Sequence, residues 1–188
     1  MSLNANALIS LADQKTYLQI TETSKDAILE LLINSVSTFL DGETNRNLKE
    51  QTYTNLLLDG NGQVLLWLPD YPVGSITTLK EDGVTLTEGT GFRVHDSNFE
   101  GYLERLDDVW SDEETQNIDF TGKLGMATIP SDLQLACFWL VAQQFKSFSL
   151  SDWGEASRGF PEGNISKFDR DIPDFIQRVI NKYKRIRL

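Results

Sequence analysis

The densest group of titratable side chains in this 188-residue chain is acidic and surrounds a tryptophan. Five carboxylates lie around Trp110: Asp107, Asp108, Asp112, Glu113 and Glu114. A helix–loop–helix calcium site needs a mid-loop glycine and a final glutamate at set positions, which this segment lacks. Paired carboxylates also cleave glycosides, but no sugar-binding platform accompanies these. We interpret the segment as a solvated hairpin tip; a weak cation site, a contact surface and a hydrolytic site are the alternatives.

The other patterns that carry chemistry are incomplete. His95 is the only histidine, so a histidine-based dyad or triad has one candidate and no partner to point to; we expect a surface or hydrogen-bonded residue. Cys137 is the only cysteine, which excludes an internal disulfide and a cysteine-ligated zinc site. Its apolar neighbours predict a packed thiol. The sequence therefore predicts no enzyme, no cofactor and no metal site.

The glycine-rich stretch Asp59–Gly62 reads Asp-Gly-Asn-Gly. It lacks the strand–GxxxxGK–helix context of a phosphate-binding loop. Asp-Gly and Asn-Gly steps favour the positive backbone angles of tight turns. We therefore expect a β-hairpin that joins the apolar runs on its two sides.

Two segments have the features of a partner-binding surface. The basic end KYKRIRL contains Lys182, Lys184, Arg185 and Arg187. It is either a solvated last helical turn stabilised by the helix dipole or a tail that docks on an acidic partner. In the preceding loop, Trp153 and Phe160 either fold back on the core or contact a partner or another subunit. These six residues are our candidate partner-binding residues.

The chain is acidic, with a formal net charge of −11. Phosphate binding needs clustered Lys and Arg, so we expect no general affinity for nucleic acid. Between Gln51 and Ala127, 14 acidic and four basic residues give a net charge of −10, whereas Asp171–Leu188 has two acidic and five basic residues, a net of +3. With 40% hydrophobic residues, no bilayer-spanning run and no secretory signal, we expect a folded protein of a reducing cytoplasm.

Four segments have helical periodicity. The segment Ser10–Ile20 begins at a plausible N-cap serine, and a longer helix follows, from Thr23 or Ser24 to about Gly42. The third segment, Ile129–Phe148, has apolar residues around much of its circumference, so it needs neighbours on more than one side. Pro173 opens the last helix. The helices near both chain ends should therefore pack over the third one, while Ser149–Arg170 between them reads as an irregular loop.

From Gln51 onwards the pattern changes to short β-prone runs separated by turn residues. After the two runs around Asp59–Gly62, the expected strands lie at Val73–Lys80, Val84–Leu86, Phe92–His95, Tyr102–Leu106 and Asn117–Gly122. They predict a small antiparallel sheet or barrel of about five to seven strands. The predicted fold class is α+β. A helical base, residues 1–50 and 128–188, carries an inserted antiparallel β subdomain, residues 51–127.

Four stretches, in this order and spacing, resemble the head–tail connector (head completion or neck adaptor) proteins of tailed double-stranded-DNA bacteriophages. They are SLADQKTYLQITETSKDAILELLINSVSTFLDGETNR, LWLPDYPVGSITTLKEDGVTL, IDFTGKLGMATIPSDLQLACFWLVAQQF and IPDFIQRVINKYKRIRL. They correspond to the family's helical opening, its β segment, its strand-to-helix passage and its terminal helix. The part from Gly83 to Asn117 does not align with the family.

The resemblance implies a structural protein of the virion neck, assembled in the host bacterial cytoplasm without a cofactor or membrane. Its copies would form a closed ring of about twelve under the portal protein. That ring would extend the DNA channel and receive a stopper or tail-completion protein. The terminal helix would dock on the portal, which places Lys182, Lys184, Arg185 and Arg187 at a contact surface. Removing Tyr183–Leu188 is then expected to leave the fold intact and abolish attachment.

Charge suggests a role for the β insert within this arrangement. We expect its acidic surface to face outward or to line the channel, where DNA would slide without sticking. A protein–protein interaction module outside virions, with a helical base and a β lobe, is the alternative function.

Overall fold

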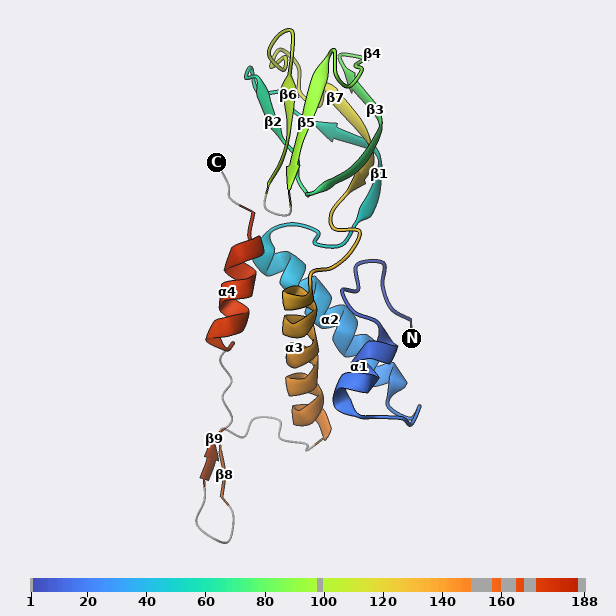
Figure 1. Cartoon of the computed structure of the whole chain (residues 1–188), viewed down its shortest axis with the longest axis vertical. Helices are drawn as coiled ribbons and strands as arrows, with labels where there is room; N and C mark the ends of the chain where they lie inside the picture. Colours follow the sequence, from blue (N-terminus) through green and yellow to red (C-terminus); the bar gives the residue numbers. More distant parts are fainter. Residues whose placement is uncertain (1, 98–99, 150–156, 160–164, 168–171, 186–188) are drawn as a thin grey trace. The chain divides into compact units, whose positions relative to one another are not determined.

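The computed structural model describes residues 2–97, 100–149, 157–159, 165–167 and 172–185. The chain forms two compact units. The first contains Met1–Thr38 and Ser131–Asn181, and the second contains Phe39–Pro130 and Lys182–Leu188. The predicted α+β class is confirmed, because antiparallel sheets are inserted between helices from the two ends of the chain (Figure 1). The domain boundaries expected at residues 50/51 and 127/128 stay a prediction.

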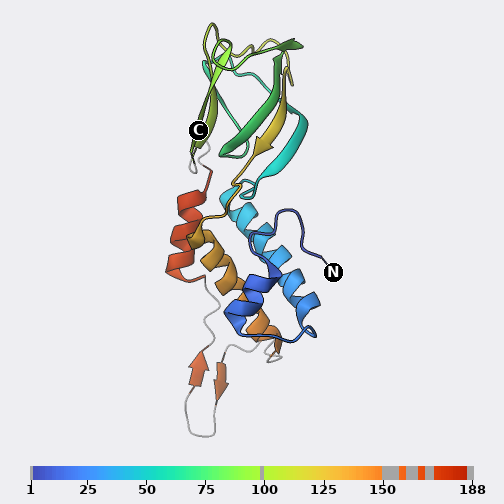
Figure 2. The same ribbon diagram turned by 45° about the vertical axis from the view of Figure 1, so that its right-hand side comes forward.

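The first unit is a helical bundle. Its helices are α1 (Leu11–Leu18), α2 (Asp26–Thr44), α3 (Ser131–Ser149) and α4 (Asp174–Tyr183), and the last turns of α2 and α4 belong to the second unit. In Figures 1 and 2, α3 lies between α2 and α4. Its inward stripe is buried and consists of Leu133, Ala136, Cys137, Leu140 and Val141. The bundle therefore forms around α3, as its wide apolar surface predicts.

Local signals set the ends of these helices. Ser10 caps α1, and its hydroxyl oxygen accepts the backbone N–H of Asp13 at 3.1 Å. After α1 the chain turns at Gln19, whose φ is 56°. Pro130 directly precedes α3, and the carbonyl oxygen of Pro173 accepts the N–H groups of the first turn of α4. The four helices predicted from periodicity are confirmed.

Within Ser149–Arg170, where the sequence predicts an irregular loop, the structure contains a short hairpin. Its strands are β8 (Ser157–Gly159) and β9 (Ile165–Lys167), paired antiparallel. The prediction of a loop without strands is wrong here. Strands of three residues are too short for an alternating pattern to be recognised in the sequence.

The second unit is built from two antiparallel sheets. One has the strand order β1 (Gln51–Leu58), β7 (Ile118–Leu124), β3 (Val73–Glu81) and β4 (Val84–Thr85). The other has the order β2 (Leu65–Trp67), β6 (Glu100–Arg105) and β5 (Phe92–Ser97). Residues from both sheets share one core, which includes Leu66, Leu79, Leu103, Phe120 and Leu124. Alternation along each strand therefore leaves one face of each sheet turned away from the core.

The hairpin expected at Asp59–Gly62 does not form. Strand β1 pairs with β7, and β2 pairs with β6, so this stretch crosses from one sheet to the other. Its backbone is fixed by distant residues: Gly60 N–H donates to the Asn117 side chain at 2.9 Å, and Gly62 N–H donates to the Trp110 carbonyl at 2.8 Å. The two glycines allow the backbone of this stretch to approach the segment that contains Trp110 and Asn117 closely, and they do not form a two-residue turn. The Asp82–Gly83 step, with φ values of 49° and 78°, does form a hairpin, between β3 and β4.

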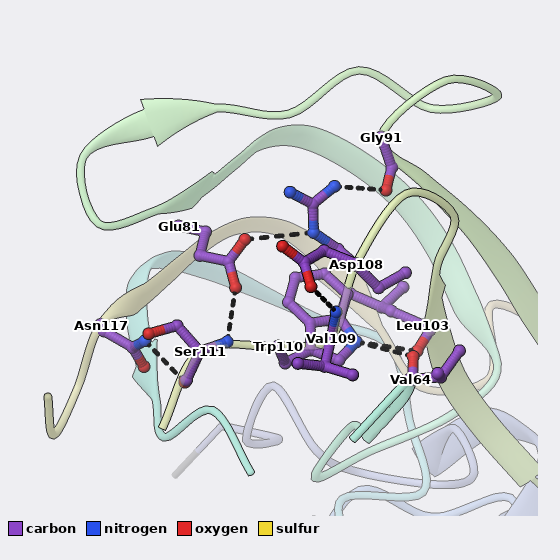
Figure 3. A network of polar contacts seen from close by, with 10 residues as sticks. Val64, Glu81, Gly91, Leu103, Asp108, Val109, Trp110, Ser111 and Asn117 are labelled. Atoms are coloured by element: carbon purple, nitrogen blue, oxygen red, sulfur yellow. Dashed lines mark hydrogen bonds and ion pairs between the residues drawn. The ribbon is translucent and has the colours of Figure 1, made fainter. Parts of the chain in front are cut away.

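The acidic segment around Trp110 is not a solvated hairpin tip, because Trp110 is fully buried. Figure 3 shows its indole directed at two backbone carbonyls, and its Nε1–H donates to Val64 at 3.1 Å and to Leu103 at 3.4 Å. Beside it, Glu81 accepts the Ser111 N–H at 2.8 Å and the Arg105 Nε–H at 3.1 Å. A buried tryptophan needs such a partner for its N–H. Segment 106–117 is thus held against the core by Trp110, although acidic residues surround it.

The close approach at Gly60 predicts a sharp difference between two glycines. A Cβ at Gly60 would overlap the carbonyl oxygen of Ser111, whereas a Cβ at Gly42, inside α2, would meet nothing within 4 Å. We expect Gly60→Ala to lower the free energy of unfolding by about 1–3 kcal/mol and Gly42→Ala to raise it by about 0.5–1 kcal/mol. Urea unfolding followed by circular dichroism measures both. Equal effects of the two substitutions would contradict this packing.

Candidate functional site

The described residues contain no group of three or more His, Cys, Asp or Glu side chains able to hold a metal ion. Across the same residues, no helix combines the length and apolarity that crossing a bilayer requires. The features that stand out are two surfaces of the second unit. One is an aromatic row on a sheet, and the other is a polar hollow where α2 leads into β1.

The aromatic row crosses the outer face of the three-stranded sheet. Trp67 on β2 and His95 on β5 are both register partners of Tyr102 on β6. The Trp67 and Tyr102 rings are 4.8 Å apart, and the Tyr102 and His95 rings stack at 4.8 Å with a 12° angle. Their neighbours Leu66 and Leu103 point into the core. The row is therefore the outward set of an alternating sheet, and Trp67 is 37% exposed.

Charged partners fix the histidine in this row. His95 Nε2 lies 2.7 Å from Glu104, and Arg93 Nη1 lies 3.2 Å from the same carboxylate. The hydrogen bond with His95 and the charge of Arg93 lower the pKa of Glu104. His95 is thus a hydrogen-bonded residue, as expected, and it takes part in an amphipathic surface suited to contact with another protein.

The hollow has a volume of about 360 Å³ and is open to solvent. Most of the residues that line it have polar side chains; the lining residues are Asp41, Asn45, Arg46, Asn47, Tyr53, Leu56, Pro69, Asp70 and Arg185. Two arginines and two aspartates are among them, so the formal charges of the lining cancel. Such a lining fastens chain segments together and leaves no uncompensated charge for an ionic ligand.

Asp70 is the centre of the hollow's hydrogen bonds and is only 2% exposed. Its carboxylate accepts the backbone N–H of Asn47 at 2.7 Å, the Asn47 side-chain amide at 2.9 Å, and the Tyr53 hydroxyl. Burial and the hydrogen bond to Asp70 raise the pKa of Tyr53 above its usual range. Three donors satisfy the buried carboxylate, so this network fixes the passage from α2 into β1.

Arg46 also lines the hollow and is 5% exposed. Its Nη1 donates to the Tyr71 carbonyl at 2.9 Å, and its guanidinium lies 3.7 Å from the centre of the Tyr71 ring. Burial lowers the pKa of Arg46 and raises that of Tyr71. Burial is the main cause of both shifts, and structural ion-pair and hydrogen-bond networks perturb pKa values as catalytic sites do, so these shifts do not by themselves mark a catalytic site.

The structure describes three of the six predicted partner-binding residues. Lys182 and Lys184 are exposed, and Lys182 lies 4.9 Å from the Tyr183 ring centre. Arg185 is half-buried, lines the hollow and donates its N–H to the Thr44 carbonyl at 2.8 Å. Trp153, Phe160 and Arg187 lie outside the described residues. Tyr183 is 2% exposed, so removing Tyr183–Leu188 also removes a buried side chain. The expectation that this deletion leaves the fold intact stays a prediction.

Comparison with known protein families shows to which family the chain belongs. A family model described as head completion protein matches residues 7–186. The chain belongs to the head completion protein family. The match includes both units described above, and the predicted resemblance is thereby confirmed. Membership also makes this head completion protein a structural component rather than an enzyme.

Solved structures share its fold along the whole chain. A chain in the neck of an empty GTA particle, computed with C6 symmetry, is 18% identical with a TM-score of 0.68, over 100% of this chain and 95% of that one. A chain in the neck of the native GTA particle, computed with C12 symmetry, is 22% identical with a TM-score of 0.62, over 100% and 97%. A chain in the virion of a native gene transfer agent particle is 19% identical with a TM-score of 0.58, over 100% and 94%. No curated protein matches the sequence.

Sequence reasoning missed both surfaces of this head completion protein. The aromatic row needs the pairing of three strands, and the sequence alone does not pair β2 with β6. The only available signal was alternation within single strands, such as Tyr102 and Glu104 on either side of Leu103. The hollow joins residues 41–56 to residues 69–70 and to Arg185. No local pattern links segments this far apart.

The Tyr53–Asp70 hydrogen bond predicts alkaline instability. The raised pKa of Tyr53 means that the folded chain holds its phenolic proton above pH 10 while the unfolded chain releases it. Stability should therefore be constant with respect to this group below about pH 10 and fall as the pH rises further. Tyr53→Phe should cost about 1 kcal/mol at pH 7 and make the alkaline loss shallower.

Urea unfolding at pH 7 and at several pH values above 10 tests this expectation. Tyr17→Phe is the matched control, because Tyr17 is 43% exposed and belongs to the first unit. An unchanged alkaline slope in Tyr53→Phe would show that this network does not control the transition.

Proposed function

We propose that this head completion protein is a neck subunit of a phage-like particle. Copies form a closed ring under the portal protein, extend the DNA channel and receive a stopper or tail-completion protein. The observation that carries the proposal is the match of nearly the whole chain, residues 7–186, to the head completion family. The fold likeness to chains from two GTA necks supports it. Its place is the neck of the virion.

The symmetry of the similar necks suggests how the copies are arranged. Those necks were computed with C6 and C12 symmetry. A closed ring is built by heterologous contact, in which one surface of each subunit meets a different surface of the next. We therefore expect about twelve copies, in keeping with the portal that the ring would meet.

The exposed basic side chains at the end of α4 are the proposed portal contact. Lys182 and Lys184 are exposed, and the backbone hydrogen bond from Arg185 to Thr44 holds the segment that carries them. Two lysines held at the edge of a contact surface steer and orient a partner of opposite charge. The proposed contact is thus electrostatic and sensitive to salt.

A charge-reversal experiment tests attachment to the portal. DNA-filled heads with an exposed portal are mixed with purified protein and sedimented, and the bound protein is quantified. We expect wild type to co-sediment and Lys182→Glu with Lys184→Glu to lose affinity by about tenfold or more, since each rim charge contributes on the order of 1 kcal/mol. Neck density in negative-stain images reports the ring directly.

The matched control for this experiment is Lys80→Glu with Lys123→Glu, which changes the net charge equally on the four-stranded sheet of the second unit, away from the aromatic row. Wild-type protein that does not attach to portal-bearing heads would refute the neck function. Equal loss in the two double variants would refute the assignment of the contact to the end of α4.

The acidic second unit is proposed to face outward or to line the DNA channel. Residues 51–127 carry a net charge of −10, which repels phosphate at low ionic strength. We expect no retardation of double-stranded DNA by micromolar protein at low salt in a gel-shift assay. Tight binding that weakens with added salt would contradict passage of DNA without sticking.

A further inference from the structure

Helix α3 has a second apolar stripe besides the one it buries. Leu135, Phe138, Trp139 and Ala142 recur at the i, i+3, i+4 and i+7 spacing of one helix face. Leu135 is 49% exposed, and the other three are half-buried. The inward stripe faces the core of the first unit, so a helix that needed only that core would have polar residues on this face.

Aromatic side chains from two other helices extend this stripe sideways. Tyr17 on α1 stacks on Phe138 with ring centres 5.4 Å apart. Phe175 on α4 meets the Trp139 ring edge-on at 6.0 Å. Tyr17 is 43% and Phe175 42% exposed, and α1 and α4 stand on either side of α3 in Figure 1. We call the five residues Tyr17, Leu135, Phe138, Trp139 and Phe175 the α3 band.

The α3 band exposes large apolar side chains to solvent: Tyr17, Leu135 and Phe175 are 43%, 49% and 42% exposed. Aromatic side chains bury the largest areas at interfaces and are enriched at their centres. Contiguous apolar patches of this kind mark contact with another protein. The four aromatic side chains of the band already contact one another in pairs, so they lose little side-chain freedom when a partner covers the band.

A different face of the same unit has the complementary properties. Within the first unit, the outward stripe of α2 consists of Ala27, Leu31, Ser35 and Thr38, and its one large residue, Leu31, is 45% exposed. The next exposed apolar residue of the helix, Phe39, belongs to the second unit. Small side chains let a helix approach bulky rings closely, and Leu31 supplies a single projecting side chain. Both faces lie within the first unit.

Charge favours the same pairing. Within the first unit, α2 carries Asp26 and Glu30 and no basic residue. Asp26 forms an ion pair with Lys15 at 2.6 Å, and Glu30 directly precedes Leu31 in the outward stripe. Next to the α3 band, Arg178 is exposed on α4, three residues after Phe175. Contact between the band and this part of α2 therefore brings Glu30 of one copy and Arg178 of the next to the edge of the contact.

We propose that the α3 band binds the outward stripe of α2 from a neighbouring copy of this chain. The inference rests on the proposed ring and names the surfaces that close it. Because the two surfaces differ, each subunit uses one toward each neighbour, and repetition closes a ring. A band that met another band would stop at a dimer.

Cross-linking between two variant chains tests the pairing. Leu31→Cys protein is mixed with Leu135→Cys protein on portal-bearing heads and treated with a short bis-maleimide, whose reach tolerates small errors in register. Burial raises the pKa of the remaining Cys137 to about 12, so wild type gives the background. We expect cross-linked heterodimers to exceed, by at least about fivefold, the dimers from either variant alone.

Two controls make the outcome decisive. Val84→Cys, at a 65% exposed position in the second unit, replaces Leu135→Cys in a parallel mixture and should give background cross-linking. Leu135→Asp should abolish ring density on heads, whereas Val84→Asp should retain it, with thermal unfolding confirming that each variant folds. If Leu135→Asp fails to fold, Leu31→Asp takes its place, because it removes the other side of the same contact.

The possible results separate the interface from the function. Rings on heads without Leu31–Leu135 cross-links, or predominant cross-linking of Leu135→Cys to itself, would overturn the pairing and leave the neck function standing. Wild-type protein that forms no ring on heads would overturn both. Heterodimer cross-links together with loss of rings in Leu135→Asp would establish the pairing.

Discussion

The burial of one face of α3 is the interaction on which the first unit depends. This helix contacts α1 through Phe138, α2 through the Ser37–Cys137 hydrogen bond and α4 through Trp139. The residues of its inward stripe are buried and uncharged. Because α1 and α2 precede the sheets and α4 follows them, closing the bundle around α3 brings helices from both sides of the β insert into one unit. The same helix then keeps an apolar face on its outer side.

The second unit is stabilised by different means, because its two sheets must be held together by the segments that cross between them. Two crossings between sheets, at Asp59–Gly62 and at segment 106–117, are tied to each other by hydrogen bonds and by the buried Trp110. The hydrogen bonds of Asp70 to Asn47 fix the passage from α2 into β1 in the same way. The buried Asp70 carboxylate and the Trp110 indole N–H both have hydrogen-bond partners, so these contacts favour a single arrangement of the segments.

These properties suit an assembly protein better than an enzyme. The perturbed pKa values belong to groups with structural hydrogen bonds, and the hollow they line has compensating charges. What the molecule presents to its surroundings is instead a set of surfaces: the aromatic row, the α3 band and the exposed lysines at the end of α4. The chain belongs to the head completion protein family, whose members are structural proteins.

The sequence by itself determined where helices form and where β-strands form, through the spacing of its apolar residues. The apolar stripes of the four helices, the Ser10 cap and the Asp82–Gly83 turn are local patterns, and local backbone preference is enough to produce them. Which strand pairs with which was decided only by the tertiary structure: an Asp-Gly-Asn-Gly signal favours a hairpin, but docking against Trp110 and Asn117 outweighs it. The aromatic row and the Asp70 hollow likewise join segments far apart in the chain. Long-range packing of this kind depends on the shared core, which no short window of sequence contains.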